Sequence, residues 1–273
     1  MSPRITVSIA LACALSALPV GAAPWESTYV APASQPTLIR GATVLDGAGR
    51  RFEAADVLLR DGKIVAVGGE LDGEGAQVIE AKGRWVTPGI IDVHSHLGVY
   101  SSPGVTAHQD GNEMIDPITA GVWAEHAVWP QDPGFATALA GGVTTLQVLP
   151  GSGNLIGGRG VTLRNVEATT YQAMKFPGAP HGLKMACGEN PKRFYGGKGQ
   201  APMTRMGNVA GYRQAFADAQ EYQRQWQDYE RDRAGKSKKD QDAKDAAPPK
   251  LSLIHISEPT RLRRISYAVF CLK

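Results

Sequence analysis

The stretch that decides the fold is Thr87-Pro88-Gly89-Ile90-Ile91-Asp92-Val93-His94-Ser95-His96. Its apolar residues predict a buried strand, and two histidines one residue apart end that strand. Because side chains alternate between the faces of a strand, we expect His94 and His96 to point the same way. Neutral imidazoles on one face suit a divalent metal such as zinc. The stretch therefore predicts a metal site, where Asp92 on the same face either orients a ligand or serves as a structural partner.

The residues before this stretch predict a small β-rich domain. Strand-like runs separated by turn residues lie at Thr37–Leu45, Asp56–Leu59, Ile64–Val67 and Gln77–Glu80. The dipeptides Asp46-Gly47 and Asp61-Gly62 favour tight turns, and the second has the spacing of a β-hairpin.

The residues after Trp85 alternate between apolar strands and helical or long connecting segments. A short helix is predicted over Phe135–Ala140, and strands are predicted over Val143–Leu149 and Gly182–Cys187. This alternation fits a parallel barrel. Asn208 is expected to cap a further helix, whose packing face is formed by Tyr212, Phe216, Ala219, Tyr222, Trp226 and Tyr229.

At the two histidines the chain resembles the amidohydrolase superfamily, including its imidazolonepropionase-like metal-dependent members, whose first barrel strand ends in the pattern P-G-x-I-D-x-H-x-H. The matching positions are Pro88, Gly89, Ile91, Asp92, His94 and His96. The resemblance covers about residues 36–250. It implies an α/β fold with a small N-terminal β-sandwich-like domain followed by a (β/α)8 TIM-type barrel. Because a full barrel takes about 250 residues, we expect an incomplete barrel, the N-terminal fragment of a longer enzyme.

The resemblance also implies the chemistry: hydrolysis of C–N bonds in amides, cyclic amides or peptides by metal-activated water, with one or two divalent ions, zinc first among them. In the superfamily a Lys (often carboxylated) or a Glu from a middle strand joins the first two histidines. Lys184 is the candidate for that position, and Glu189 is the alternative. Two later histidines and an aspartate that acts on the water have no match before Lys250, so the catalytic base is not identified. The expected partner is a small-molecule or peptide substrate.

Further polar residues lie in segments that follow predicted barrel strands, where the active sites of such barrels form. His108, Glu113 and His126 are candidates for contact with the substrate or the metal ligands, and a solvated loop position is the alternative for each. Arg159 lies in a glycine-rich segment over 151–160, whose backbone is expected to approach a ligand closely. Arg159 itself is a candidate partner for a substrate carboxylate.

The N-terminus predicts a secretory signal peptide over residues 1–23. Arg4 supplies the positive start, Ile5–Leu18 form an apolar core, and Val20–Ala23 are the small residues before cleavage. The apolar run is too short for stable insertion in a bilayer. We therefore expect export to the periplasm or the medium.

Residues 251–273 resemble the translation of sequencing-adapter DNA. Leu251–Arg261 match a transposase-type library adapter, Ile265–Leu272 match a flow-cell adapter, and Leu262–Arg264 fall where a variable index lies. Two adapters in the right order, frame and spacing indicate an artefactual tail, which is excluded from the fold prediction.

This tail also accounts for the basicity of the chain. The formal net charge is +3, and residues 251–273 hold four basic residues against one acidic residue. The remaining chain is therefore neutral and gives no indication of nucleic-acid binding. Without the signal peptide and the tail only Cys187 remains, predicted as a small buried residue rather than a nucleophile.

The sequence thus divides into a signal peptide (1–23), a β-rich domain (24–88), a partial hydrolase barrel (89–233), a polar connector (234–250) and the tail (251–273). The chain by itself is expected to be inactive, because later ligands and the catalytic aspartate are missing. The alternative interpretation is a non-catalytic periplasmic binding or scaffold protein with a degenerate barrel.

Overall fold

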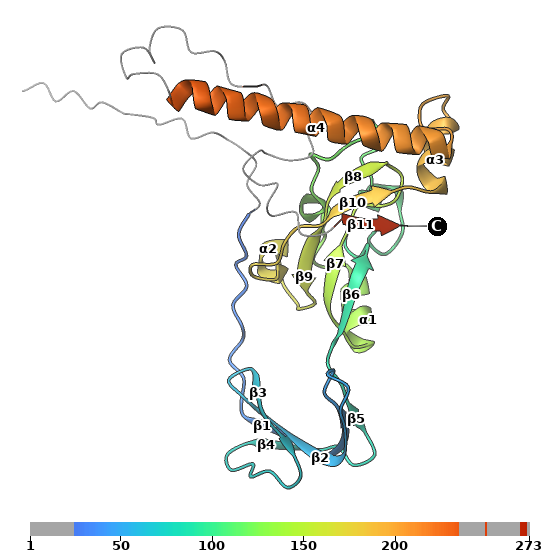
Figure 1. Ribbon diagram of the computed structural model, residues 1–273. Coiled ribbons are helices and arrows are strands. Elements are labelled where there is room, and N and C mark those ends of the chain that lie inside the picture. Colours follow the sequence, from blue (N-terminus) through green and yellow to red (C-terminus); the bar gives the residue numbers. More distant parts are fainter. Residues whose placement is uncertain (1–24, 235–248, 250–267, 272–273) are drawn as a thin grey trace, which may run out of the picture.

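The computed structural model describes residues 25–234, 249 and 268–271 (Figure 1). The predicted signal peptide therefore lies outside the described residues, as do nearly all of the predicted connector and most of the predicted tail.

One mixed sheet forms the N-terminal part. Its strands are β1 (Thr37–Leu45), β2 (Arg51–Arg60), β3 (Lys63–Gly68), β4 (Gln77–Glu80) and β5 (Trp85–Val86). The strand order is β3-β2-β1-β4, and β5 pairs with the far end of β1. Strands β1 and β4 have the predicted bounds. The described residues form a single sheet here, so the predicted β-sandwich-like arrangement is not confirmed.

Local turn chemistry explains this sheet. Asp61 and Gly62 have φ angles of 52° and 69°, which is the geometry that a two-residue hairpin turn between β2 and β3 requires. The sheet buries a small apolar cluster, consisting of Ala42, Val44, Ala55, Val57 and Ala81. Asp56 is also buried, and its carboxylate accepts hydrogen bonds from the backbone N of Gly41 (2.9 Å) and of Leu71 (3.1 Å).

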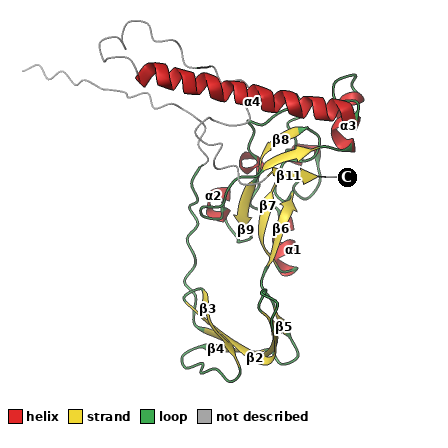
Figure 2. Ribbon diagram, viewed as in Figure 1, coloured by secondary structure: helices red, strands yellow, loops and turns green. Residues whose placement is uncertain are grey.

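The second part of the molecule holds all of the helices among the described residues (Figure 2). Its elements are β6 (Ile90–Ser95), η1 (Thr106–His108), η2 (Ala124–Ala127), α1 (Pro133–Ala140), β7 (Val143–Val148), β8 (Ile156–Arg159), β9 (Val161–Arg164), α2 (Tyr171–Met174), β10 (Leu183–Ala186), α3 (Glu189–Gly196), α4 (Arg205–Ala234) and β11 (Ala268–Cys271). Of these helices, none among the described residues is both long and apolar enough to cross a membrane.

Two three-stranded sheets form this part, in the orders β6-β7-β9 and β8-β10-β11. The pairs β6–β7 and β10–β11 are parallel, whereas β7–β9 and β8–β10 are antiparallel. The chain passes from β8 to β9 through Gly160, whose N donates to Gly182 O (2.8 Å). This crossing links the two sheets and brings β10 close to β6. Strand β11, from the segment assigned to the tail, pairs with β10.

The strands β8 and β9 correct the sequence interpretation in two ways. Residues 156–159 were expected in a glycine-rich loop but form β8, and β7 has antiparallel β9 beside it instead of a third parallel strand. Glycine has no side chain to show the alternation typical of a strand, and it disfavours strands. The glycines at 157, 158 and 160 therefore left the sequence without a recognisable strand pattern in this segment.

Strand β6 was expected to be buried, but its apolar side chains are exposed. Ile90, Ile91 and Val93 have exposed fractions of 53%, 66% and 64%. The reason is its position: β6 is the edge strand of its described sheet and has only β7 as a neighbour there. No described element covers these three side chains.

The helices pack against two apolar cores. The first lies among α1, β7, β9 and α2, and includes Phe135, Leu146, Leu163 and Met174. The second joins β8 and β10 to the helix α4, which crosses above them in Figure 1 and contributes Ala215. The predicted start of this helix was wrong, because Thr204 Oγ1 accepts from Gly207 N (3.0 Å) and α4 begins at Arg205.

Candidate metal centre

His96 follows the last residue of β6 and is held by the neighbouring strand. Leu149 directly follows β7, and its carbonyl O lies 2.8 Å from His96 Nδ1. The backbone N of Leu149 in turn donates to Ser95 O (2.9 Å). A proton on Nδ1 satisfies the Leu149 carbonyl and makes Nε2 the nitrogen whose lone pair can bind a metal ion, the usual arrangement of a ligating histidine.

Lys184 comes from β10, 90 residues further along the chain, and reaches His94. Its Nζ lies 2.8 Å from His94 Nε2, and its side chain is fully buried. The rings of His94 and His96 are 5.1 Å apart between centroids. The structure therefore brings together the three residues that the sequence and the resemblance singled out as metal ligands.

Glu189, the alternative to Lys184, is the first residue of α3 and is exposed. No described hydrogen bond or ion pair joins it to either histidine. The position of Lys184 inside β10, with its side chain directed at His94, makes it the better candidate of the two.

The other two predicted residues have different surroundings. Asp92 Oδ1 accepts from the backbone N of His94 (3.0 Å), so it fixes the backbone at the end of β6. Arg159 places its guanidinium over the ring of Trp123, 4.5 Å from the centroid. Their predicted roles toward ligands or substrate stay predictions.

Nowhere in the described part of the chain do three His, Cys, Asp or Glu side chains gather closely enough to hold a metal ion. The candidate centre therefore consists of two imidazoles and one lysine. Two such histidines with a third nitrogen, or a carboxylated lysine, are suitable donors for zinc, but a complete coordination sphere needs further ligands.

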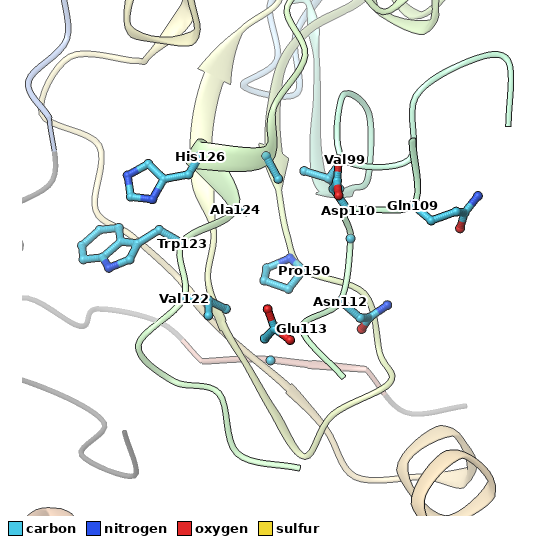
Figure 3. A pocket seen from close by; sticks show the side chains of 13 residues that line it. Val99, Gln109, Asp110, Asn112, Glu113, Val122, Trp123, Ala124, His126 and Pro150 are labelled. Atoms are coloured by element: carbon cyan, nitrogen blue, oxygen red, sulfur yellow. The ribbon is translucent and has the colours of Figure 1, made fainter. Parts of the chain in front are cut away.

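The second part contains a cavity of about 400 Å³ (Figure 3), and none of the three candidate ligands is among its lining residues. It is lined by Val99, Gln109, Asp110, Gly111, Asn112, Glu113, Val122, Trp123, Ala124, His126, Ala127, Pro150 and Gly157. Pro150 follows Leu149, which binds His96, and a Cβ on Gly157 would lie 3.7 Å from Lys184 Cγ. Glu113 and His126 thus line a cavity beside the candidate ligands. His108 is not among the lining residues, and its Nδ1 lies 2.8 Å from Pro103 O.

Sequence reasoning missed the residues that hold the cavity wall. Asn112 Oδ1 accepts from Gly153 N (2.9 Å), and Asn112 Nδ2 donates to the hydroxyl of Tyr100. Burial raises the pKa of that hydroxyl. The glycine-rich segment was the available signal: a Cβ on Gly151 would lie 2.2 Å from Asn112 Nδ2. At Gly151 the missing side chain therefore admits a neighbouring loop, whereas the sequence interpretation assigned the space to a ligand.

A second buried network supports the same loop. Asn154 Nδ2 donates to Glu113 O (2.6 Å) and to Thr119 Oγ1 (2.7 Å), while its Oδ1 lies 3.0 Å from the hydroxyl of Tyr195. Tyr195 is fully buried, and this burial raises its pKa to about 12. The network fixes the backbone of Glu113 at the cavity rim.

The known proteins that are similar to this chain point to one family. Models of known families give no match. Amidohydrolase tasK of Hapsidospora irregularis is 34% identical over 234 residues, which cover 76% of this chain and 24% of that protein. A dihydroorotase of Pelotomaculum thermopropionicum is 42% identical over 72 residues, covering 26% of this chain and 16% of the relative.

The fold is similar to a crystal structure of an amidohydrolase from Thermotoga maritima. The TM-score is 0.66 and the sequence identity 36%, over 71% of this chain and 50% of that one. The chain thus spans between a sixth and a half of the lengths of these three relatives.

Proposed function

The chain belongs to the amidohydrolase superfamily, and from this premise we propose that it forms the N-terminal part of a metal-dependent hydrolase acting on C–N bonds. The substrate class is non-peptide amides, cyclic amides or peptides. The tasK relative and the Thermotoga maritima structure are both described as amidohydrolases, which supports the class of reaction.

The observation that carries this proposal is the meeting of Lys184 with the histidine pair. A fully buried lysine with its Nζ 2.8 Å from an imidazole Nε2 is an unusual feature that calls for a physical reason, since buried charged groups are paired or coordinate metal ions. A metal ion held by His94, His96 and Lys184, the last in its carboxylated form, gives such a reason.

The chemistry divides between the ion and the chain. When bound, a divalent ion such as zinc supplies the Lewis acidity that activates water and polarises the amide carbonyl. The Leu149 carbonyl orients His96 through Nδ1, so that Nε2 is the nitrogen that would bind the ion, and β10 holds Lys184 rigidly against His94. The cavity beside them gives the substrate a place to bind.

The proposal also covers the groups that this chain does not supply. One or two ions are proposed, with further ligands and the general base supplied by later sequence, so the chain by itself is expected to be inactive. Export to the periplasm or medium is proposed from the signal-peptide pattern around Arg4.

The test uses the complete gene product and a panel of linear amides, cyclic amides and dipeptides. We expect hydrolysis that a chelator abolishes and zinc restores. The double variant His94→Asn/His96→Asn is expected to lose more than the about 10–100-fold typical of residues that only support a ligand. His108→Asn, which alters a histidine outside the cavity, is the matched control and is expected to keep its activity and its metal.

Hydrolysis that survives both the chelator and the double substitution would contradict the proposal. A complete gene product that binds no metal and hydrolyses nothing in the panel would instead support the non-catalytic binding or scaffold protein.

A further inference from the structure

Tyr100 lies between the candidate metal centre and the cavity, and contacts both. Its ring packs edge-on against the ring of His96, with the centroids 5.7 Å apart and the planes at 81°. Its hydroxyl accepts a hydrogen bond from Asn112 Nδ2, and Asn112 lines the cavity. One side chain thus joins a candidate ligand to the cavity wall.

The backbone of Tyr100 is fixed close to His96. The backbone N of Tyr100 donates to His96 O (3.1 Å). Tyr100 also forms an isolated antiparallel bridge with Gln109, the first residue of the run 109–113 that lines the cavity, here called the cavity loop. The side chain has little freedom to move away, because Gly111 packs on the ring: a Cβ there would lie 2.2 Å from Tyr100 Cζ.

The cavity loop is also hydrogen-bonded to the glycine-rich segment over 151–160. Gly151 N donates to Gly111 O (2.7 Å), and Gly153 N donates to Asn112 Oδ1 (2.9 Å). Since Asn112 uses its oxygen for Gly153 and its nitrogen for Tyr100, it bridges the glycine-rich segment and the tyrosine. A change at Asn112 is therefore transmitted to the ring that packs on His96.

We propose, on the basis of the proposed function, that Tyr100 is a positioning residue with two separable parts. Its ring fixes the orientation of His96 for metal binding, and its hydroxyl holds Asn112 and the cavity loop in place for the substrate. Partners that orient a metal ligand affect metal affinity even though they never touch the ion.

The test compares Tyr100→Phe with Tyr100→Leu in the complete gene product. Tyr100→Phe keeps the ring and removes the hydroxyl, so KM is expected to rise about fivefold, the ratio for a hydrogen bond of about 1 kcal/mol, while metal affinity stays unchanged. Tyr100→Leu removes the ring, so zinc affinity, measured by competition with a chromophoric chelator, is expected to fall about tenfold.

Tyr195→Phe is the matched control. Its hydroxyl also belongs to a buried network behind the cavity loop, 2.7 Å from Asp116 O, but that network does not reach the histidines. We expect Tyr195→Phe to lower the thermal midpoint without changing zinc affinity. A purely structural role for Tyr100 predicts the same pattern for its two variants, namely lower thermal midpoints with zinc affinity and KM unchanged.

Two results would overturn the inference: Tyr100→Leu binding zinc as tightly as the wild type, or Tyr100→Phe leaving KM unchanged. Failure of the proposed function is seen separately, because then either the wild type binds no zinc and hydrolyses nothing, or His94→Asn/His96→Asn leaves zinc binding and hydrolysis intact. A folded Tyr100→Leu variant is confirmed by a cooperative thermal transition before the zinc titration.

Discussion

The N-terminal sheet and the second part of the molecule differ in how many polar side chains they bury. Strands β1, β2 and β3 are joined by tight turns between neighbours in sequence, and Asp56 is the one buried charged or polar residue described in that sheet. The second part buries Ser95, Ser101, Thr119, Glu125, Asp132, Asn154, Asn165, Lys175, Lys184 and Asn208.

This difference shows in which part of the molecule the exact placement of polar side chains matters most. A buried polar group is costly unless it is hydrogen-bonded or paired. Several of these residues in the second part, among them Asp132 and Asn154, hold particular loops in place through hydrogen bonds to backbone atoms. The candidate metal centre and the cavity lie in that part, whereas the N-terminal sheet is held by apolar packing and turns.

The largest expected effect concerns the buried ion pair between Lys175 and Glu125, a residue of η2. Lys175 Nζ lies 2.6 Å from Glu125 Oε2, with side-chain exposures of 8% and 1%. Burial and the Glu125 charge together raise the pKa of nearby Tyr171 to about 12. Lys175→Met removes the close partner of the buried carboxylate and leaves, among the described residues, only His126 Nε2, 3.7 Å from Glu125 Oε1, so the free energy of unfolding in urea is expected to fall by about 3–5 kcal/mol.

Two further variants sharpen that result. Glu125→Leu/Lys175→Met removes both charges and is expected to recover most of the loss. Glu221→Gln removes a carboxylate from an exposed pair with Arg224 and is expected to change the free energy of unfolding by less than about 1 kcal/mol. A loss below about 1 kcal/mol for Lys175→Met would show that the buried pair stabilises the second part no more than an exposed pair does.

The next effect compares one buried aspartate from each part. Asp132 accepts from Gly98 N (2.9 Å), Ser102 N (3.2 Å) and Gly134 N (2.9 Å), and so ties the loop after His96 to the start of α1. Asp56 has the corresponding role in the N-terminal sheet. Alanine at either position is expected to lower the free energy of unfolding by about 2–3 kcal/mol.

Zinc affinity should separate these two variants. Asp132→Ala loosens the loop that begins at His96, so its zinc affinity is expected to fall about tenfold, whereas Asp56→Ala should bind zinc like the wild type. Equal zinc affinity for the two variants would show that the site does not depend on the buried polar groups of the second part.

The smallest effect is a dependence of stability on pH through His181. Its Nδ1 lies 2.8 Å from Gly160 O, where β8 passes into β9, and burial lowers the pKa of the ring. Because the folded pKa is below the unfolded value of about 6.5, protonation favours the unfolded chain. The stability is therefore present above that value and is lost as the pH falls through the folded pKa.

His181→Gln is expected to lose less stability than the wild type between pH 7 and pH 5, as measured by urea unfolding at each pH. An identical slope in the two proteins would show that His181 titrates alike in the folded and unfolded states.

The sequence was a better guide to the N-terminal sheet than to the second part, for a physical reason. The bounds of β1 and β4 and the hairpin at Asp61-Gly62 follow from short-range patterns. In the second part His94 and Lys184 meet across 90 residues through the β8–β9 crossing, which the glycines concealed. Lys184 was identified through the family resemblance, and the signal for Tyr100 and Asn112 lay further along the chain, in the glycine-rich segment over 151–160 that packs against them.

The role of the buried lysine is decided by the zinc content of the complete gene product and two single variants, determined by elemental analysis after dialysis. We expect the wild type and Glu189→Gln to retain zinc, and Lys184→Met to lose it. Zinc retained in Lys184→Met and lost in Glu189→Gln would contradict the assignment of Lys184 as the third ligand.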